Sequence, residues 1–139
     1  ASCAYFVMND ELQSQLLTDS YIGICSDGSS NGFHPRGHGT FAKIIERYVL
    51  QEKILTLEEA IRKMTSFAAS VLAITDRGML KIGQKADILV FEPKNIKALA
   101  TYPNPFQLAQ GFDIVLVNGE IARKYNHLTG KLSGQVLIP

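Results

Sequence analysis

The chain has 139 residues, enough for one ordinary domain and too few for a complete α/β barrel. Hydrophobic residues make up 46% of the sequence and charged residues 19%, so we expect a packed core and not a disordered chain. Fourteen Lys and Arg residues against 13 Asp and Glu give a net charge of +1. That balance gives no reason to expect a nucleic-acid or acidic-membrane partner.

Two cysteines, Cys3 and Cys25, are too few for a disulfide scaffold and favour a reduced, cytoplasmic compartment. No apolar run approaches the ~18 residues that a membrane-spanning helix needs, so we expect no membrane partner. The sequence opens on Ala1 and not on Met, and an apolar run follows at once. We therefore expect a processed chain or the tail of a longer polypeptide.

The first 28 residues predict a strand, a helix and a second strand, followed by a turn. Residues 4–8 are an apolar run rich in strand formers, and Asn9 or Asp10 can cap the helix after it. Residues 21–25 are a second apolar run, which stops at the polar turn 26–28. A continuous apolar run bounded by turn residues is typical of a parallel strand covered by helices on both faces. The alternation predicts an α/β layer.

Two amphipathic helices are expected next. Thr40 can cap the first, whose apolar positions recur with helical spacing at Phe41, Ile44, Ile45, Tyr48 and Val49. Thr56 and Glu59 have the spacing of a capping box at the start of the second. Its apolar stripe consists of Leu57, Ile61, Met64, Ala68 and Val71, and we interpret this stripe as an ordinary core face.

From residue 75 onward the pattern favours an antiparallel β domain. The expected strands cover residues 79–82, 86–91, 114–117 and 120–124, with a long irregular loop at 93–112 and an extended tail at 128–139. Asn118 and Gly119 separate two strand-like runs, which predicts a tight hairpin because both central residues favour a positive φ. The chain therefore divides into residues 1–74, the closing strand-helix portion of an α/β layer, and residues 75–139, a small β domain.

Asp27 is the leading candidate for chemistry, because it follows a predicted buried strand at its carboxyl end, where α/β sheets place their active sites. A carboxylate there can bind a metal or transfer a proton. The alternative is that residues 26–28 are merely a turn, which spacing alone favours. Cys25 lies on the same side of the strand and can be a thiolate ligand, although a small buried hydrophobe fits better.

The loop after this strand contains two histidines and an arginine. His34 and His38 are four residues apart, a zinc-binding spacing when both lie on one helix face, but the proline and glycines around them argue against a helix. Arg36 can hold a substrate carboxylate through its bidentate fork, or it can be a solvated loop residue. The sequence has no phosphate-binding glycine loop and no serine-nucleophile motif, so it contains no complete catalytic constellation.

Several segments together resemble one family. Residues 24–28, followed by 34–36 and 39–41, resemble the last barrel strand and loop of the N-acyl-D-amino-acid deacylases, or D-aminoacylases, and residues 57–65 continue the likeness. Residues 78–91 resemble the G-x-I-x-x-G-x-x-A-D-L-V segment of metal-dependent amidohydrolases, and residues 115–119 resemble their V-x-V-N-G hairpin. Thr129, Gly130 and Gly134 match the deacylase tail. The resemblance implies the last βα portion of a TIM-like amidohydrolase barrel followed by part of a small antiparallel β domain.

The resemblance also implies a reaction. Such enzymes use zinc at the carboxyl end of a barrel to generate hydroxide, which attacks the linear amide of an N-acyl-D-amino acid and releases a carboxylate and a free D-amino acid. Asp27 matches the carboxylate that contacts the metal and transfers the proton. Arg36 matches the arginine that holds the substrate carboxylate, and His34 is expected to shape the same substrate-binding loop.

The remaining metal ligands of such enzymes, further histidines and a bridging cysteine, have no match in this sequence. We therefore expect an inactive, metal-free chain when isolated, with the N-terminal barrel portion as its partner, and self-association through the exposed edge at 21–25. Two alternatives stay open. The chain can be a non-catalytic folding or assembly module, or it can belong to a cyclic-amide hydrolase of the hydantoinase or dihydroorotase kind. Arg36 favours the linear substrate.

Overall fold

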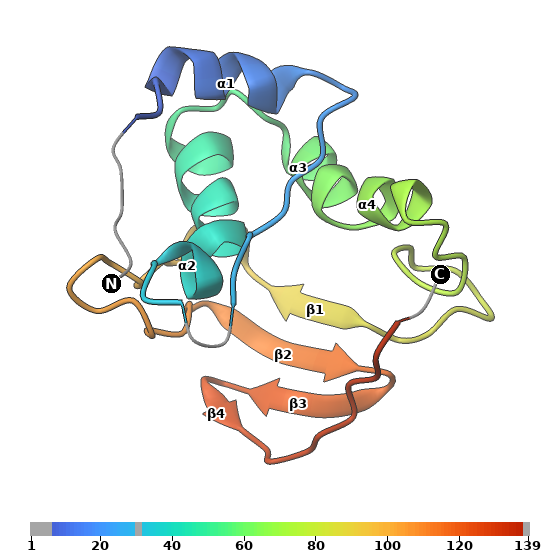
Figure 1. Ribbon diagram of the computed structural model, residues 1–139. Helices are drawn as coiled ribbons and strands as arrows, with labels where there is room; N and C mark the ends of the chain where they lie inside the picture. Colours follow the sequence, from blue (N-terminus) through green and yellow to red (C-terminus); the bar gives the residue numbers. More distant parts are fainter. Residues whose placement is uncertain (1–6, 30–31, 138–139) are drawn as a thin grey trace.

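A computed structural model describes residues 7–29 and 32–137, and it places a group of helices above a small sheet (Figure 1). The helical elements are α1 (Asp10–Thr18), α2 (Arg36–Lys43), the π-helix η1 (Ile44–Gln51), α3 (Leu57–Met64), α4 (Ser66–Val71) and the short 3₁₀ helix η2 (Pro93–Asn95). The strands are β1 (Ile88–Phe91), β2 (Phe112–Val117), β3 (Glu120–Lys124) and β4 (His127–Leu128). Helices therefore dominate the first half of the chain and strands the second.

The sheet has the order β1-β2-β3-β4 with every neighbouring pair antiparallel, which confirms the antiparallel sheet expected after residue 75. Asn118 and Gly119 turn the predicted hairpin, with φ angles of 49° and 84°. Both angles lie in the left-handed region that this tight turn requires. A second turn with positive φ at Tyr125 and Asn126 adds the short strand β4, which the sequence analysis did not separate from the tail.

Tyr21 lies in a turn and residues 22–25 then follow an extended path (Figure 1), so the prediction that residues 21–25 form a strand in a sheet is wrong for the described part of the chain. Among the described residues, their backbone makes one backbone–backbone hydrogen bond to another element, from the Ile24 amide to the Lys63 carbonyl at 3.3 Å. A strand needs a neighbouring strand to accept its hydrogen bonds, and no strand lies beside this segment among the described residues. The strand expected at residues 4–8 lies mostly outside the described residues.

Helix α1 begins as predicted, because the Asn9 side chain accepts a hydrogen bond from the Leu12 amide at 3.0 Å. Helix α2 instead begins at Arg36, four residues before the expected start at Thr40. Pro35 already has a helical φ of −59°, and the ring of His34 accepts the Arg36 amide at 3.1 Å, so a proline and a histidine together begin this helix. The expectation that proline and glycine prevent a helix here was wrong.

The capping box is half formed. Thr56 accepts from the Glu59 amide at 3.2 Å as predicted, but the Glu59 carboxylate binds Arg62 at 2.7 Å and does not reach back to Thr56. The helix then breaks at Thr65, whose φ and ψ are −130° and −90°. This break turns α4 away from the predicted stripe, and Val71 is 68% exposed.

The strand expected at residues 79–82 is also absent from the structure. These residues form bends and turns, and Leu80 and Ile82 are fully or almost fully exposed. They have no strand beside them among the described residues, so their alternating pattern has no face to bury.

The core lies between the helices and extends to the sheet. One cluster contains Leu17, Ile24, Ile44, Tyr48, Leu55 and Ala60, and a second contains Ala42, Ile45 and Ile96. Ile96 comes from the long loop 93–112 and is completely buried. Glu46 of η1 accepts hydrogen bonds from the Lys97 ammonium and the Ala98 amide, each at 2.9 Å. The loop that the sequence left irregular is therefore fastened to the helices.

Lys63 of α3 is a buried cation that holds the extended segment in place. Its ammonium donates to the Ile22 carbonyl at 2.7 Å and to the Asp19 carbonyl, and it lies 3.8 Å from the Glu59 carboxylate. A buried charge needs such partners, because burying a charged group without hydrogen bonds costs several kcal/mol of folding free energy. The segment that leads to Asp27 is thereby fixed against α3, as its path past α3 in Figure 1 shows.

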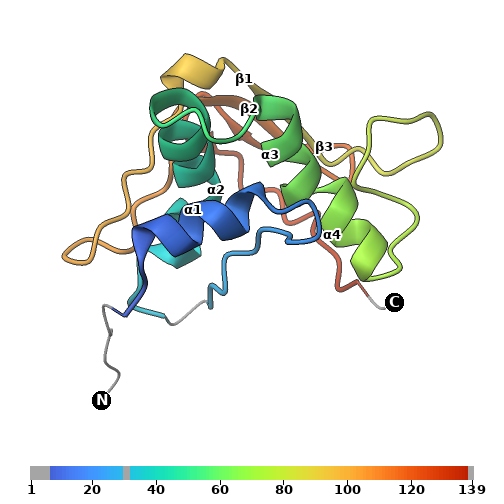
Figure 2. The same ribbon diagram turned by 90° about the horizontal axis from the view of Figure 1, so that it is seen from above.

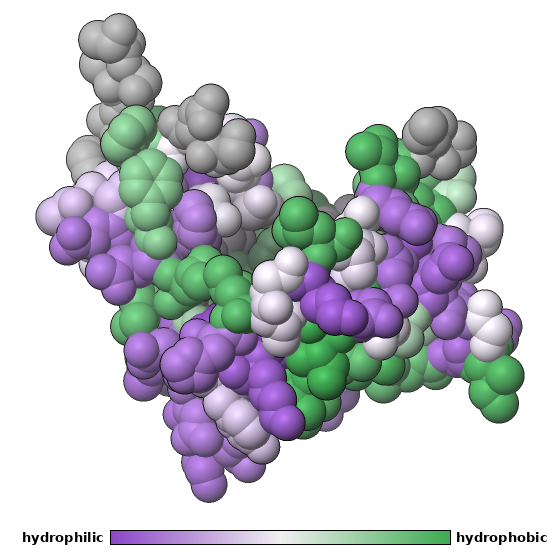
Figure 3. Space-filling model, turned by 90° about the horizontal axis from the view of Figure 1, so that it is seen from below, coloured by the Kyte–Doolittle hydropathy of each residue, from purple (hydrophilic) through white to green (hydrophobic). Residues whose placement is uncertain are grey.

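Many large apolar side chains remain on the surface. Seen from above, α1 and α4 lie on the outside of the helical group (Figure 2). From the opposite side, apolar areas interrupt the hydrophilic surface in several places (Figure 3). Among the described residues, no helix has the length and apolar character that crossing a membrane demands.

Candidate functional site

Asp27 lies where the extended segment turns toward α2. Its φ of 46° is left-handed, a conformation that Asp tolerates better than most residues because its short side chain can bond locally. Gly28 follows it against α2, and a Cβ on Gly28 would lie 2.8 Å from the Cα of Gly37. Two glycine backbones therefore touch, and this contact places the Asp27 turn directly on the first turn of α2.

Arg36 and Asp27, predicted separately, are bonded to each other. The Arg36 Nη2 lies 2.8 Å from the Asp27 carboxylate, and its Nε donates to the Asp27 backbone carbonyl at 3.0 Å. The Arg36 side chain is 48% exposed and that of Asp27 is 77% exposed. An ion pair this open to water contributes about 0–1 kcal/mol, so either partner can exchange it for another charge.

His34 contacts both the start of α2 and the long loop 93–112. Its Nδ1 accepts a hydrogen bond from the Arg36 amide at 3.1 Å, and its Nε2 lies 3.3 Å from the hydroxyl of Tyr102. The two rings meet edge to face, with centroids 5.1 Å apart. Burial of the ring, together with the nearby positive charge of Arg36, lowers the pKa of His34 below its ordinary value. His34 thus contacts the arginine backbone and a tyrosine.

The two histidines do not form the zinc-binding pair that their spacing suggests. His34 precedes α2, whereas His38 lies within it. The ring of His38 packs edge to face on Phe106, with centroids 5.7 Å apart, and its Nδ1 has no hydrogen-bond partner among the described residues.

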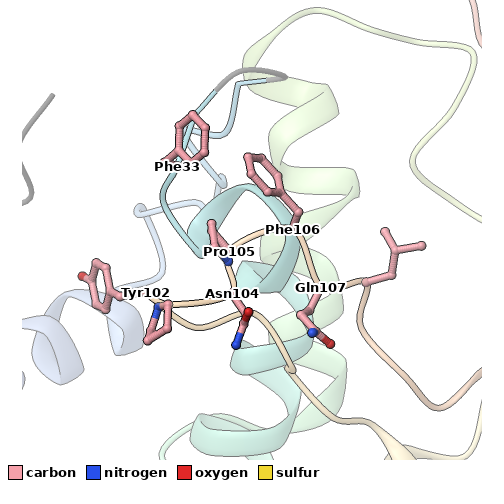
Figure 4. Close-up of a pocket in the computed structure, with 8 residues that line it drawn as sticks. Phe33, Tyr102, Asn104, Pro105, Phe106 and Gln107 are labelled. Carbon is pink, nitrogen blue, oxygen red and sulfur yellow. The ribbon is translucent and has the colours of Figure 1, made fainter. Parts of the chain in front are cut away.

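Sequence reasoning missed the contribution of the long loop. Phe33 and residues 102–108 line an open pocket of about 610 Å³ beside the His34 turn (Figure 4). The rings of Phe33 and Phe106 lie close together at one side of it, with centroids 5.1 Å apart, while Tyr102 projects from the far end of the loop. The signal in the sequence was the concentration of aromatic and proline residues in a segment without helical or strand period.

A second, smaller hollow of about 340 Å³ lies between the extended segment and α4. We call it the α4 groove, and it is lined by Tyr21, Gly23, Ile24, Cys25, Phe67, Ala68, Val71 and Leu72. Cys25 is a free, exposed thiol here, so the expectation that it is a small buried hydrophobe was wrong. It is exposed because no described segment covers this side of residues 21–25. Cys3 lies outside the described residues.

The described residues do not build a metal centre by themselves. In residues 7–29 and 32–137, no group of three or more His, Cys, Asp or Glu side chains converges. Asp27 offers one exposed carboxylate, a ligand type that zinc accepts, and its partner in the structure is Arg36. Asp27 therefore fits a role as one ligand of a metal whose other ligands come from elsewhere.

Comparisons with known proteins agree on one family. A family model described as Amidohydrolase family matches residues 24–123. The N-acyl-D-aspartate deacylase of Alcaligenes xylosoxydans xylosoxydans is 35% identical over 100% of this chain and 28% of its own length.

Two solved structures give the same result. A D-aminoacylase mutant in complex with CuCl2 superimposes with a TM-score of 0.90 and 32% identity over 96% of this chain and 28% of its own. The N-acyl-D-glutamate deacylase of Bordetella bronchiseptica, complexed with zinc and a phosphonate inhibitor, superimposes with a TM-score of 0.81. It is 34% identical over 85% of this chain and 25% of its own. These matches confirm the resemblance to the deacylases, and the chain spans less than a third of each relative. Because the family model covers more than half of the sequence, this chain belongs to the amidohydrolase family.

Proposed function

We propose that this chain is the C-terminal part of a zinc-dependent hydrolase that cleaves the linear amide of N-acyl-D-amino acids into a carboxylate and a free D-amino acid. The observation that carries the proposal is the contact of Arg36 with Asp27 at 2.8 Å, at the end of the extended segment. A substrate of this class carries its amide one carbon away from a carboxylate. A proton-transferring carboxylate and a carboxylate-binding guanidinium side by side suit that spacing.

Asp27 would act on the proton of the attacking water. Its exposed carboxylate can accept that proton and pass it to the nitrogen of the leaving amine, which departs as the amide bond breaks. When bound, zinc would polarise the amide carbonyl and lower the pKa of a water ligand. Asp27 would be one ligand of that zinc, and its exposed side chain is accessible to such a ligand role.

Arg36 would hold the α-carboxylate of the substrate. In the structure its guanidinium is occupied by Asp27, so substrate binding exchanges one carboxylate for another. Both side chains are open to water, which makes the exchange inexpensive. His34 would keep the Arg36 backbone in place through its Nδ1 during this exchange.

The partner of this chain would be the N-terminal barrel portion of the same enzyme. Residues 22–25 are extended and lack a neighbouring strand among the described residues, and the adjoining α4 groove exposes Tyr21, Val71 and Leu72. A barrel strand laid along residues 21–25 would satisfy the backbone, and the helix that follows it would cover the groove. The isolated chain would then lack both the metal and activity.

Linear and cyclic amides differ in whether they offer Arg36 a free carboxylate beside the bond that is cleaved. A linear N-acyl amino acid has a free carboxylate beside the scissile bond, and the bidentate fork of an arginine fits it. The relatives matched over most of this chain are named for N-acyl-D-aspartate, N-acyl-D-glutamate and D-aminoacyl substrates, which are linear. A non-catalytic assembly module, the other alternative, gives no reason for a carboxylate held by an arginine at a turn with positive φ.

Amino-acid release from N-acetyl-D- and N-acetyl-L-amino acids tests the proposal. The experiment uses the full-length polypeptide that carries this sequence, loaded with zinc, beside its Asp27→Asn variant. We expect D-selective release, reduced about 10²- to 10⁴-fold in kcat by Asp27→Asn with zinc retained, because the proton-transferring group is lost.

Asp10→Asn is the matched control, since Asp10 is another surface carboxylate paired with an arginine, Arg47, at 3.3 Å. It should leave kcat unchanged. Undiminished activity of Asp27→Asn would reduce Asp27 to a turn residue. A zinc-loaded parent that releases no amino acid of either hand would favour the assembly module.

A further inference from the structure

Tyr102 reaches the candidate site from a distant part of the sequence. It lies on the loop 93–112, and its hydroxyl is 3.3 Å from the Nε2 of His34. The opposite nitrogen of the same ring, Nδ1, accepts the Arg36 amide. A neutral imidazole that accepts at Nδ1 carries its proton at Nε2, so that nitrogen can donate to the Tyr102 hydroxyl. One ring therefore connects the two loops.

We propose that Tyr102 is a positioning residue for the substrate-binding arginine. By holding the His34 ring at Nε2, it keeps Nδ1 aimed at the Arg36 amide, and it thereby fixes where α2 begins and where the guanidinium points. The inference rests on the proposed function, in which Arg36 binds the substrate carboxylate. It assigns the loop 93–112 a role in substrate binding in addition to its role as a connection.

Hydrogen bonds and burial hold the loop in place before Tyr102 and around it. Thr101 and Asn104 exchange two backbone hydrogen bonds of 3.1 Å each, which close a tight turn around Tyr102. On the N-terminal side, Ile96 is completely buried and the Ala98 amide is bonded to Glu46 of η1. A group held by a packed helix can orient a side chain on an exposed turn, whereas a mobile one cannot.

A second contact joins the same two loops and makes a clean test possible. Phe33 and Phe106 meet at 5.1 Å between ring centroids, apart from Tyr102 along the same loop (Figure 4). Tyr102→Phe would keep its ring against His34 and would leave this aromatic contact untouched. The variant therefore removes a single hydroxyl without separating the loops.

Two variants cut the connection from opposite ends. Tyr102→Phe removes the hydroxyl. His34→Asn keeps an acceptor for the Arg36 amide, because Asn Oδ1 occupies nearly the place of His Nδ1, but it no longer reaches Tyr102. In the full-length, zinc-loaded polypeptide, each change should raise KM for an N-acetyl-D-amino acid by about 3- to 10-fold, as expected for one lost hydrogen bond, while kcat changes by less than about 2-fold.

The double variant should be no worse than either single variant, since both break one connection. Tyr125→Phe is the matched control, because Tyr125 is an exposed tyrosine of the second hairpin, and its KM should equal that of the parent. An unchanged KM in Tyr102→Phe would overturn the inference. So would an equal rise in KM for an N-acyl amine, which has no carboxylate for Arg36 to hold.

A measurement without substrate separates this inference from the proposed function. In ¹⁵N-histidine NMR spectra, the parent should show His34 protonated at Nε2, and Tyr102→Phe should shift that nitrogen and accelerate hydrogen exchange of the Arg36 amide. Unchanged signals would refute the positioning role. If the parent hydrolyses no N-acyl amino acid, the proposed function fails, and the NMR result alone then decides whether Tyr102 holds this turn.

Discussion

At the scale of single residues, the site is a chain of contacts that runs through four side chains. Tyr102 meets His34, His34 accepts the Arg36 amide, and Arg36 binds Asp27. The sequence singled out three of these residues because they lie within ten positions of each other beside a predicted strand end. It did not find Tyr102, which is 68 residues from His34 along the chain and has no pattern of its own. The contacts between the four residues follow from tertiary packing.

The pKa of His34 should respond in opposite directions to the two charges beside it. Burial and the Arg36 charge lower this pKa, while Asp27 raises it. Arg36→Gln should therefore raise the pKa of His34, and Asp27→Asn should lower it further, in an NMR titration of the ring. Identical pKa values in both variants would show that neither charge faces the ring.

The sign of the pH effect on stability follows from the same shift. A histidine whose pKa is lower in the folded state binds fewer protons there than when unfolded, so the unfolded state gains protons first as the pH falls. The stabilisation from His34 is full above about pH 6.5, its ordinary pKa, and declines below it. Protonated His34 also loses its acceptor for the Arg36 amide. Acidification should therefore loosen the start of α2.

At the scale of elements, the sequence predicted correctly those caps and turns whose contacts lie only a few positions away along the chain. The caps at Asn9 and Thr56 and the hairpin at residues 118–119 need only neighbours a few positions away, and all three formed. The apolar patterns of residues 21–25 and 79–82 resemble strands, but a strand forms only beside another strand, and a local pattern does not show whether that neighbour exists. The start of α2 was missed because a histidine ring, and not a standard cap, accepts the first amide.

The contact between the Asp27 turn and α2 predicts that two glycines respond differently to alanine. Gly28→Ala would place a Cβ 2.8 Å from the Gly37 backbone, whereas Gly37→Ala would place one 3.9 Å from Gly28. Gly28→Ala should lower the free energy of unfolding by about 1–3 kcal/mol, because backbone must move. Gly37→Ala should stay within about 1 kcal/mol of the parent, since its Cβ has room and alanine favours a helix. Chemical denaturation measures both, and equal losses would contradict the close contact.

At the scale of the whole molecule, the α4 groove and the candidate site lie at two ends of one segment. Tyr21, Gly23, Ile24 and Cys25 line the groove, and Asp27 follows Cys25 by two positions. An edge that exposes backbone and apolar side chains is a place where another chain can pair. Family membership and the antiparallel sheet could be read from the sequence, because they are encoded in continuous motifs. The groove could not, since it depends on how α4 turns after Thr65.

We expect the 139-residue chain to self-associate through the α4 groove. Val71→Lys should reduce this association, because a solvated charge would have to be buried in the contact. Leu132→Lys is the control, since Leu132 is almost fully exposed and is not among the residues that line the groove. Sedimentation velocity measures the sizes. A monodisperse monomer for the parent, or the same sizes for both variants, would show that copies do not meet at this groove.

The buried ammonium of Lys63 also has a consequence for the order in which the chain takes shape. It binds the Ile22 carbonyl across 41 residues, so the path of the segment that carries Asp27 cannot be set until Lys63 has been synthesised. At ribosomal rates of about 5–20 residues per second, that delay is about 2–8 s. The bonds that fasten residues 21–25 to α3 can therefore form only after this interval, once Lys63 is present.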